Sequence, residues 1–117
     1  MNFISPISTD SLLCEAEVES LYYKLVEQLN KDFNLANEGV DFPMSISPEE
    51  LKIQLHEYMY RLIHHIFAEY LYLLYIIDVP EEQVKKLDGS DIVLLSEQIA
   101  FLILKREWQK VWFRNKL

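Results

Sequence analysis

The chain has 117 residues, of which 50% are hydrophobic and 26% are charged, a composition typical of one folded domain and not of a disordered chain. Nineteen acidic residues against eleven basic ones give a net charge of −8. Because this charge repels nucleic-acid phosphates and anionic lipids, we expect neither nucleic-acid nor membrane binding.

The first predicted helix starts at Thr9 or Asp10 and runs to about Asn34. Short polar side chains at its start can accept hydrogen bonds from the free amides of the first turn. Apolar residues follow at helical spacing and form one face: Leu13, Leu21, Leu25, Leu29 and Phe33. We therefore expect one continuous amphipathic helix over this range.

The segment LANEGVDFPMSIS is predicted to be extended. Its apolar residues Val40, Phe42, Met44 and Ile46 alternate with polar residues or proline, which is the two-residue period of an extended chain. No second strand-like segment offers a pairing partner. We expect a strap that presses alternate side chains onto the helices, and a binding loop is the alternative.

The second long helix is predicted to begin at Ser47, a capping residue that precedes Pro48 in the first turn and Glu50 at a position that favours an acid. We expect it to continue for roughly 45 Å, as far as Ile77. Its apolar seam consists of Leu55, Met59, Leu62, Ile66, Leu73 and Ile77. Beyond Ile66 the helix is apolar on almost every side, which predicts that protein covers it on several sides.

A short helix should follow from Pro80, with Gly89 in the left-handed conformation as its stop. Ser90 or Asp91 then caps the last long helix, which extends to Leu117. The predicted fold is all-α. Residues 1–117 are expected to form one antiparallel bundle of three long helices plus one short connecting helix, with the extended strap between the first two.

The predicted compartment is the cytoplasm. The most apolar window, YMYRLIHHIFAEYLYLLYII, contains Arg61, His64, His65 and Glu69, whose charges would be costly at the centre of a bilayer. The only cysteine, Cys14, cannot form an internal disulfide. The opening residues MNFISPIS also lack the basic flank of a secretory signal.

The sequence KVWFRN near the end resembles the recognition helix of homeodomains, which carries a motif like V-W-F-x-N. The resemblance covers Val111, Trp112, Phe113, Asn115 and Lys116, and it implies that Asn115 would read adenine. The surrounding sequence does not fit that family. The preceding AFLILKREWQ contains no turn residue, no basic run follows, and the chain is acidic as a whole. We therefore predict no DNA binding.

The same stretch is unusually basic, because residues 105–117 hold five Lys or Arg against Glu107 alone. Cations at a helix C-terminus offset the helix dipole, and Trp108 and Trp112 share one face that could complete the core. The alternative is a basic and aromatic docking surface for a protein partner. The partner-binding residues predicted on this basis are Trp108, Lys110, Trp112 and Arg114.

Metal and cofactor chemistry has little support in the sequence. His65 and Glu69 stand one helical turn apart, so both could reach one ion. Helical bundles that hold two metal ions use Glu-x-x-His motifs on facing helices, and this chain has none. We predict no metal, no cofactor and no catalytic residue.

Seven tyrosines, including Tyr58, Tyr60, Tyr70 and Tyr72, suit boundaries between an apolar interior and water. Together with the wholly apolar end of the second helix, they predict a homodimer. The expected function is non-enzymatic, by protein–protein interaction or as a structural protein. One alternative is an acidic inhibitor or immunity-type protein that binds a basic partner through Glu15, Glu17 and Glu19. The other is a metal-dependent bundle enzyme that uses His64, His65 and Glu69.

Overall fold

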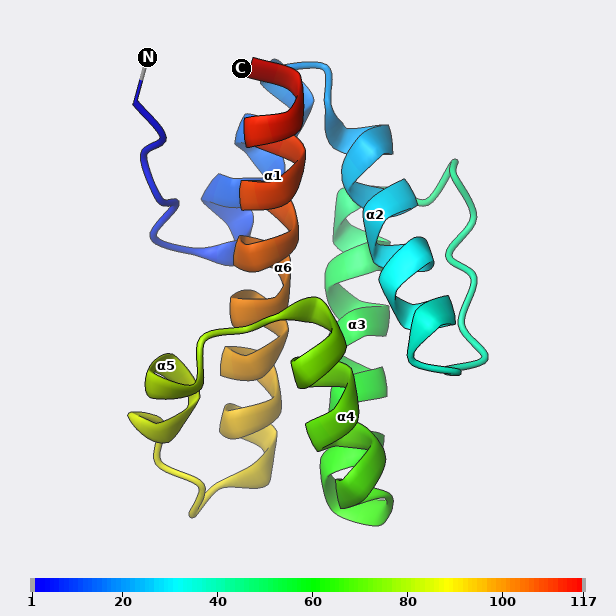
Figure 1. The fold of residues 1–117 in the computed structure, drawn as a ribbon, viewed down its shortest axis with the longest axis vertical. Helices are drawn as coiled ribbons and strands as arrows, with labels where there is room; N and C mark the ends of the chain where they lie inside the picture. Colours follow the sequence, from blue (N-terminus) through cyan, green and yellow to red (C-terminus); the bar gives the residue numbers. More distant parts are fainter. Residues whose placement is uncertain (1, 117) are drawn as a thin grey trace.

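A computed structural model describes residues 2–116, which form six helices and no β-strand (Figure 1). The helices are α1 (Thr9–Val18), α2 (Tyr22–Leu35), α3 (Pro48–His65), α4 (Phe67–Ile77), α5 (Glu81–Lys85) and α6 (Ile92–Lys116). The predicted all-α class is therefore confirmed. Three long helices with one short connector are not what these residues form, because two of the expected long helices are each divided in two.

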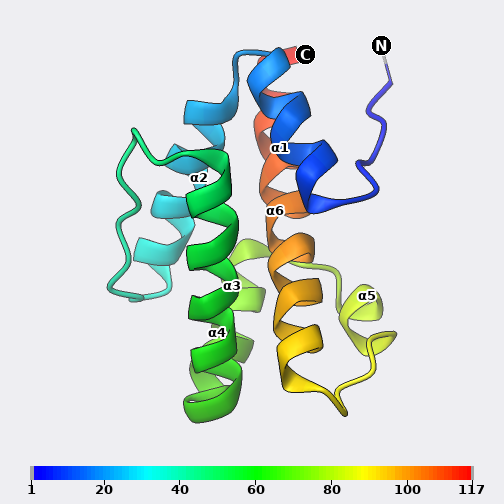
Figure 2. The ribbon, with the colours of Figure 1, turned by 180° about the vertical axis from the view of Figure 1, so that it is seen from behind.

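Helix α6 is the central column of the fold. It packs against each of the other five helices, and its most extensive pairing is with α3, which runs in the opposite direction (Figures 1 and 2). It buries side chains on several sides, including Ile99, Ile103, Leu104 and Trp108. A helix that is apolar all round is typically enclosed by others, and α6 is the helix of this chain that is enclosed in this way.

The first expected helix is broken at Ser20, which lies between α1 and α2 with a φ of 59°. The amide of Leu21 donates to the carbonyl of Ala16 at 2.8 Å, and the amide of Ser20 donates to that of Glu17 at 2.9 Å. This is the Schellman pattern, in which a left-handed residue satisfies the last carbonyls of a helix. The turn allows both α1 and α2 to pack on α6, which one straight helix could not do.

The second expected helix is broken at Ile66, so that α4 folds back along α3 (Figure 1). No glycine or proline marks the position. A straight helix of roughly 45 Å would exceed the longest dimension of the molecule, which is 37 Å. Folding back buries Tyr70, Leu73 and Ile77 of α4 against the bundle. The free energy of that burial offsets the hydrogen bonds lost at the corner.

The strap between α2 and α3 is not helical, as predicted, but it is not extended throughout, because it turns at Met44 and Ser45, where the amide of Ile46 donates to the carbonyl of Pro43 at 2.9 Å. It presses Phe42 and Ile46 into the core, whereas Met44 is exposed. Its backbone pairs with side chains. Asn30 Nδ2 donates to the carbonyl of Phe42 at 2.8 Å, and the amide of Phe42 donates to Asn30 Oδ1 at 2.7 Å. Tyr22 Oη donates to the carbonyl of Ile46 at 2.8 Å. Because the strap returns along α2, helices α2 and α3 run in the same direction and are not antiparallel (Figures 1 and 2).

The helix starts are close to those predicted. Ser47 Oγ accepts the amide of Glu50 at 3.2 Å, and Asp91 Oδ1 accepts the amide of Val93 at 3.0 Å at the start of α6. The prediction for Gly89 was wrong, because neither glycine has a positive φ and α5 already ends at Lys85. Leu117, the predicted end of the last helix, and Met1 lie outside the described residues.

Candidate functional site

The two tryptophans of the basic C-terminal stretch face inward. Trp108 is fully buried, and Trp112 is nearly so, in edge-on contact with Phe3 at 5.3 Å between ring centroids. They therefore complete the core, which is the first of the two interpretations given above. Of the four predicted partner-binding residues, Arg114 is the one classed as exposed, and Phe113 beside it is also exposed. A partner-binding role for these four residues remains a prediction.

The other two predicted residues, Lys110 and Arg114, reach across to α2. Lys110 Nζ lies 2.7 Å from Asp32 Oδ2 and 2.7 Å from Glu107 Oε1. Arg114 donates to Gln28 Oε1 at 2.9 Å, and Gln28 Nε2 donates to Asp32 Oδ2 at 3.1 Å. These contacts join α2 to α6 through a polar layer in which Gln28, Asp32 and Glu107 are all buried. The effect of these contacts is to hold α2 against α6.

Glu107 is the most perturbed acid of this layer. Burial raises its pKa to about 9, and a hydrogen bond with Asp32 acts in the same direction, against the lowering effect of Lys110. As a carboxylate, Glu107 accepts no aligned hydrogen bond, but as a carboxylic acid it can donate one to Asp32. Burial alone would raise the pKa of Asp32, yet hydrogen bonds from Glu107, Lys110 and Gln28 bring it below its ordinary value. At neutral pH the layer thus holds a neutral Glu107 beside an Asp32–Lys110 ion pair.

A second buried acid, Glu38, lies where the strap leaves α2. Tyr58 Oη donates to Glu38 Oε1, and the other oxygen of Glu38 is buried without a hydrogen-bond partner among the described residues. Burial raises the pKa of Glu38, and the nearby charge of Glu69 raises it further, against the hydrogen bond from Tyr58. Burial and the Glu38 hydrogen bond likewise raise the pKa of Tyr58. The hydrogen bond joins the strap to α3.

The histidines are not organised as a metal site. Ile66 ends α3 between His65 and Glu69, so the two no longer lie one turn apart on a single helix, and no ion pair joins them among the described residues. His64 stacks on Tyr60 with ring centroids 5.7 Å apart. Within residues 2–116, no three His, Cys, Asp or Glu side chains are grouped closely enough to hold a metal ion.

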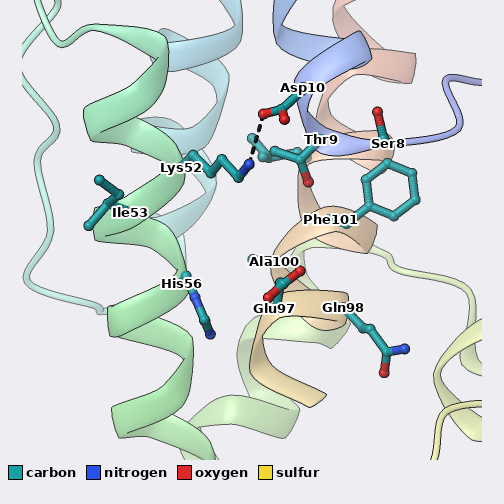
Figure 3. A pocket seen from close by; sticks show the side chains of 11 residues that line it. Ser8, Thr9, Asp10, Lys52, Ile53, His56, Glu97, Gln98, Ala100 and Phe101 are labelled. Carbon is teal, nitrogen blue, oxygen red and sulfur yellow. Dashed lines mark hydrogen bonds and ion pairs between the residues drawn. The ribbon is translucent and has the colours of Figure 1, made fainter. Parts of the chain in front are cut away.

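A hollow of about 450 Å³ lies between the start of α1, the middle of α3 and α6 (Figure 3). Some of its polar groups are already engaged: Lys52 Nζ lies 2.8 Å from Asp10 Oδ1, and His56 Nε2 lies 3.1 Å from the carbonyl of Val93. Glu97 and Gln98 also line the hollow, and Gln98 Oε1 is buried without a hydrogen-bond partner among the described residues. Apolar side chains such as Ile53 and Phe101 line much of the rest.

The acids of α1 proposed for a basic partner are partly engaged. Glu19 forms an ion pair with Lys116 of α6, whereas Glu17 is exposed and Glu15 is half-buried. The three residues thus offer a smaller free negative surface than their number indicates. Cys14, on the same helix, is exposed and free.

The most unusual surface lies on α4. Six residues of this helix are exposed, and all but Glu69 are apolar or aromatic: Phe67, Ala68, Leu71, Tyr72 and Tyr75. We call these five residues the α4 face. Phe67, Leu71 and Tyr75 follow each other at steps of four and form one row along the helix. Phe67 is 55% exposed, Leu71 50% and Tyr75 77%. The only charged residue of the helix, Glu69, is also exposed and lies at the edge of this face, one turn before Tyr72, where its charge acts on Glu38.

The α4 face continues into a groove of about 380 Å³ where α4 meets α5. Leu71, Leu74 and Tyr75 form one wall of this groove. The segment that leads to α5 forms the other, with Val79 and Pro80, and Val84 of α5 also contributes. The sequence predicted that this end of the second helix would be covered on several sides, but within the described chain one side of it is bare.

Comparison with models of protein families, with curated proteins and with solved structures gives no match to this chain. Among residues 2–116, no helix combines the length and the apolar character that a membrane crossing requires.

Proposed function

We propose that this protein acts through protein–protein interaction, without catalysis, and that the α4 face is the surface that binds. The observation that carries the proposal is the row of exposed apolar and aromatic residues on α4, which has one exposed acid, Glu69, at its edge and lies on a chain of net charge −8. Protein surfaces generally place charged residues on exposed helix sides, and a bare apolar stripe usually marks a site of association.

The size of the α4 face supports this proposal. An aromatic side chain has about 150–250 Å² to bury, so the exposed fractions of Phe67, Leu71, Tyr72 and Tyr75 amount to roughly 450 Å². Patches of about this size on monomeric proteins are often functional. Aromatic residues, tyrosine among them, are also enriched in the cores of interfaces, where charged residues are depleted. The α4 face has both properties.

Site-specific photo-crosslinking in cells that produce the protein tests this function. A benzophenone side chain in place of Tyr75 should give a crosslink to protein, and the crosslink should disappear when Leu71→Glu is added. The matched control is the same probe in place of Tyr23, a tyrosine of α2 that is 51% exposed. Equal labelling from both positions would contradict the proposed function.

The acidic-inhibitor alternative predicts a different outcome. A basic partner would be bound most tightly at low salt and would be released by Glu17→Lys, while the variant Leu71→Glu would bind normally. The two functions are therefore separated by which of these substitutions abolishes the crosslink or the binding.

A further inference from the structure

We infer that the α4 face binds a second copy of this chain, packed about a two-fold axis that passes close to Leu71. This inference rests on the proposed function and adds the identity of the partner. A two-fold interface requires one surface that is complementary to itself, because each residue meets the counterpart of its own contact. The shape, the charge and the area of the α4 face each meet this requirement.

Shape is the first argument. Phe67, which is 55% exposed, lies at one end of the row, and the groove beside Tyr75, Val79 and Pro80 lies at the other end. Phe67 and Tyr75 both lie four residues from Leu71, which is about 6 Å along the helix axis in either direction. When two α4 helices pack antiparallel with Leu71 near the axis, Phe67 of each copy therefore comes opposite the groove of the other. The projection and the hollow occur twice in the dimer, once at each end.

Charge is the second argument. Two copies that each carry −8 repel one another wherever their acidic surfaces approach. The five residues of the α4 face bear no charge, so their contact removes no ionised group from water. Two acids line the adjoining groove, Asp78 and Glu81, and each is already in an ion pair within the chain, with Arg106 and Lys85. It also lacks the basic residues by which an amphipathic helix binds an anionic membrane surface. A second copy of the chain meets these conditions, because its own α4 face is equally uncharged.

Area is the third argument. Roughly 450 Å² from the exposed row of each copy gives about 900 Å² for the pair, to which the walls of the two grooves add. Stable interfaces bury about 1,200–2,000 Å² in total. The exposed rows alone fall below this range, in the class of weak and transient interfaces. The dissociation constant of the dimer should be on the order of 1–100 μM.

Sedimentation equilibrium of the purified protein between about 1 and 500 μM tests this inference. The wild-type chain should show a monomer–dimer equilibrium, and Leu71→Glu should weaken it at least about tenfold. The matched control is Leu94→Glu, on α6, because Leu94 is 47% exposed and Leu71 is 50% exposed. This control should dimerise like the wild type. Tyr75→Glu, at the most exposed position of the face, provides a second variant with little risk to folding, and circular dichroism verifies that each variant is folded.

Three outcomes would overturn the inference: a wild-type chain that is monomeric throughout this range, a dimer that Leu71→Glu and Tyr75→Glu leave intact, or equal weakening by Leu94→Glu. A monomer in solution together with a Leu71-dependent crosslink to another protein in cells would overturn the homodimer while the proposed function stands. A monomer in solution that also gives no Leu71-dependent crosslink in cells would overturn both proposals.

Discussion

Glu107 of α6 lies beside Asp32 of α2 in the interior, and a hydrogen bond between the two raises the pKa of Glu107 and lowers that of Asp32. Both side chains are buried, and Lys110 Nζ lies 2.7 Å from an oxygen of each. One polar layer thus holds three ionisable groups, of which Asp32 and Lys110 form an ion pair and Glu107 is neutral. This makes the stability of the fold sensitive to pH in a direction that can be stated in advance.

The first prediction concerns Glu107→Gln. In the unfolded chain Glu107 loses its proton near its ordinary pKa, whereas in the folded chain the pKa is about 9. The stability that depends on this group is therefore fully present at low pH and declines as the pH rises towards 9, by up to about 1.4 kcal/mol per pH unit. Glutamine keeps the shape and the hydrogen bond to Asp32, so the variant should lose this decline and be more stable than the wild type at pH 8.

Urea denaturation at several pH values between 5 and 9 measures the difference. Glu27→Gln is the control, because Glu27 is an exposed acid of α2, and it should follow the wild type. If the stability of Glu107→Gln declined with pH as steeply as that of the wild type, Glu107 would be ionised in the folded protein.

The second prediction concerns Lys110→Met. Removal of the ammonium leaves the buried carboxylate of Asp32 without its counter-ion, which typically costs about 3–5 kcal/mol. The double variant Asp32→Asn/Lys110→Met should regain a large part of this loss, because no charge then remains unpaired. A double-mutant cycle by chemical denaturation gives the coupling energy, and simple additivity of the two single effects would disprove the ion pair.

The third prediction concerns the strap. Asn30 exchanges two hydrogen bonds with the backbone of Phe42, as a neighbouring strand would. Asn30→Ala should therefore cost about 1–3 kcal/mol, because it leaves a half-buried amide and carbonyl without partners. Hydrogen exchange should accelerate at the amide of Phe42 and leave the core helices protected. Asn34→Ala, at an exposed position one turn later, is the control.

This pairing also explains what the sequence could not predict about the strap. Alternation of Val40, Phe42, Met44 and Ile46 correctly indicates a non-helical strap that buries Phe42 and Ile46, but it misses the turn at Met44. It does not reveal the partner, because the partner is a side chain on a helix and not a second strand. An asparagine among the other polar residues of an amphipathic helix gives no signal of such a role.

Helix ends were the least predictable part of the fold. Three helices end at left-handed residues that are not glycine: Ser20, Asn37 and Asp78. Sequence rules look for glycine at such positions, and both glycines of this chain lie elsewhere and have no positive φ. The corner at Ile66 has no local signal at all, because it is imposed by the burial of α4.

The fourth prediction follows from these helix ends. A left-handed conformation costs an ordinary L-residue about 1–2 kcal/mol, so Ser20→Gly should stabilise the protein by up to about 1 kcal/mol. Ser20→Ala should give no such gain, because alanine carries the same Cβ. Thermal denaturation of the two variants compares them directly, and a gain from alanine equal to that from glycine would mean that backbone conformation is not the cause.

The candidate site could be predicted in part. The apolar run of α4 indicated a helix in contact with protein on several sides, and it favoured self-association. Which side stays bare depends on packing, because Phe67, Leu71 and Tyr75 are as apolar as the buried Tyr70 and Leu73. Trp108 and Trp112 indicated a docking surface because they stand among cations in the sequence. Both are buried in the core.

The most direct test of the α4 face is a disulfide between two copies. In the background Cys14→Ser, which removes the only native thiol, the substitution Leu71→Cys places a cysteine near the proposed two-fold axis. The two Cα atoms of a disulfide lie about 4.4–6.8 Å apart, so mild oxidation should give a covalent dimer rapidly, whereas Leu94→Cys in the same background should give it slowly. If Leu71→Cys forms the disulfide no faster than Leu94→Cys, the α4 faces of two copies do not meet.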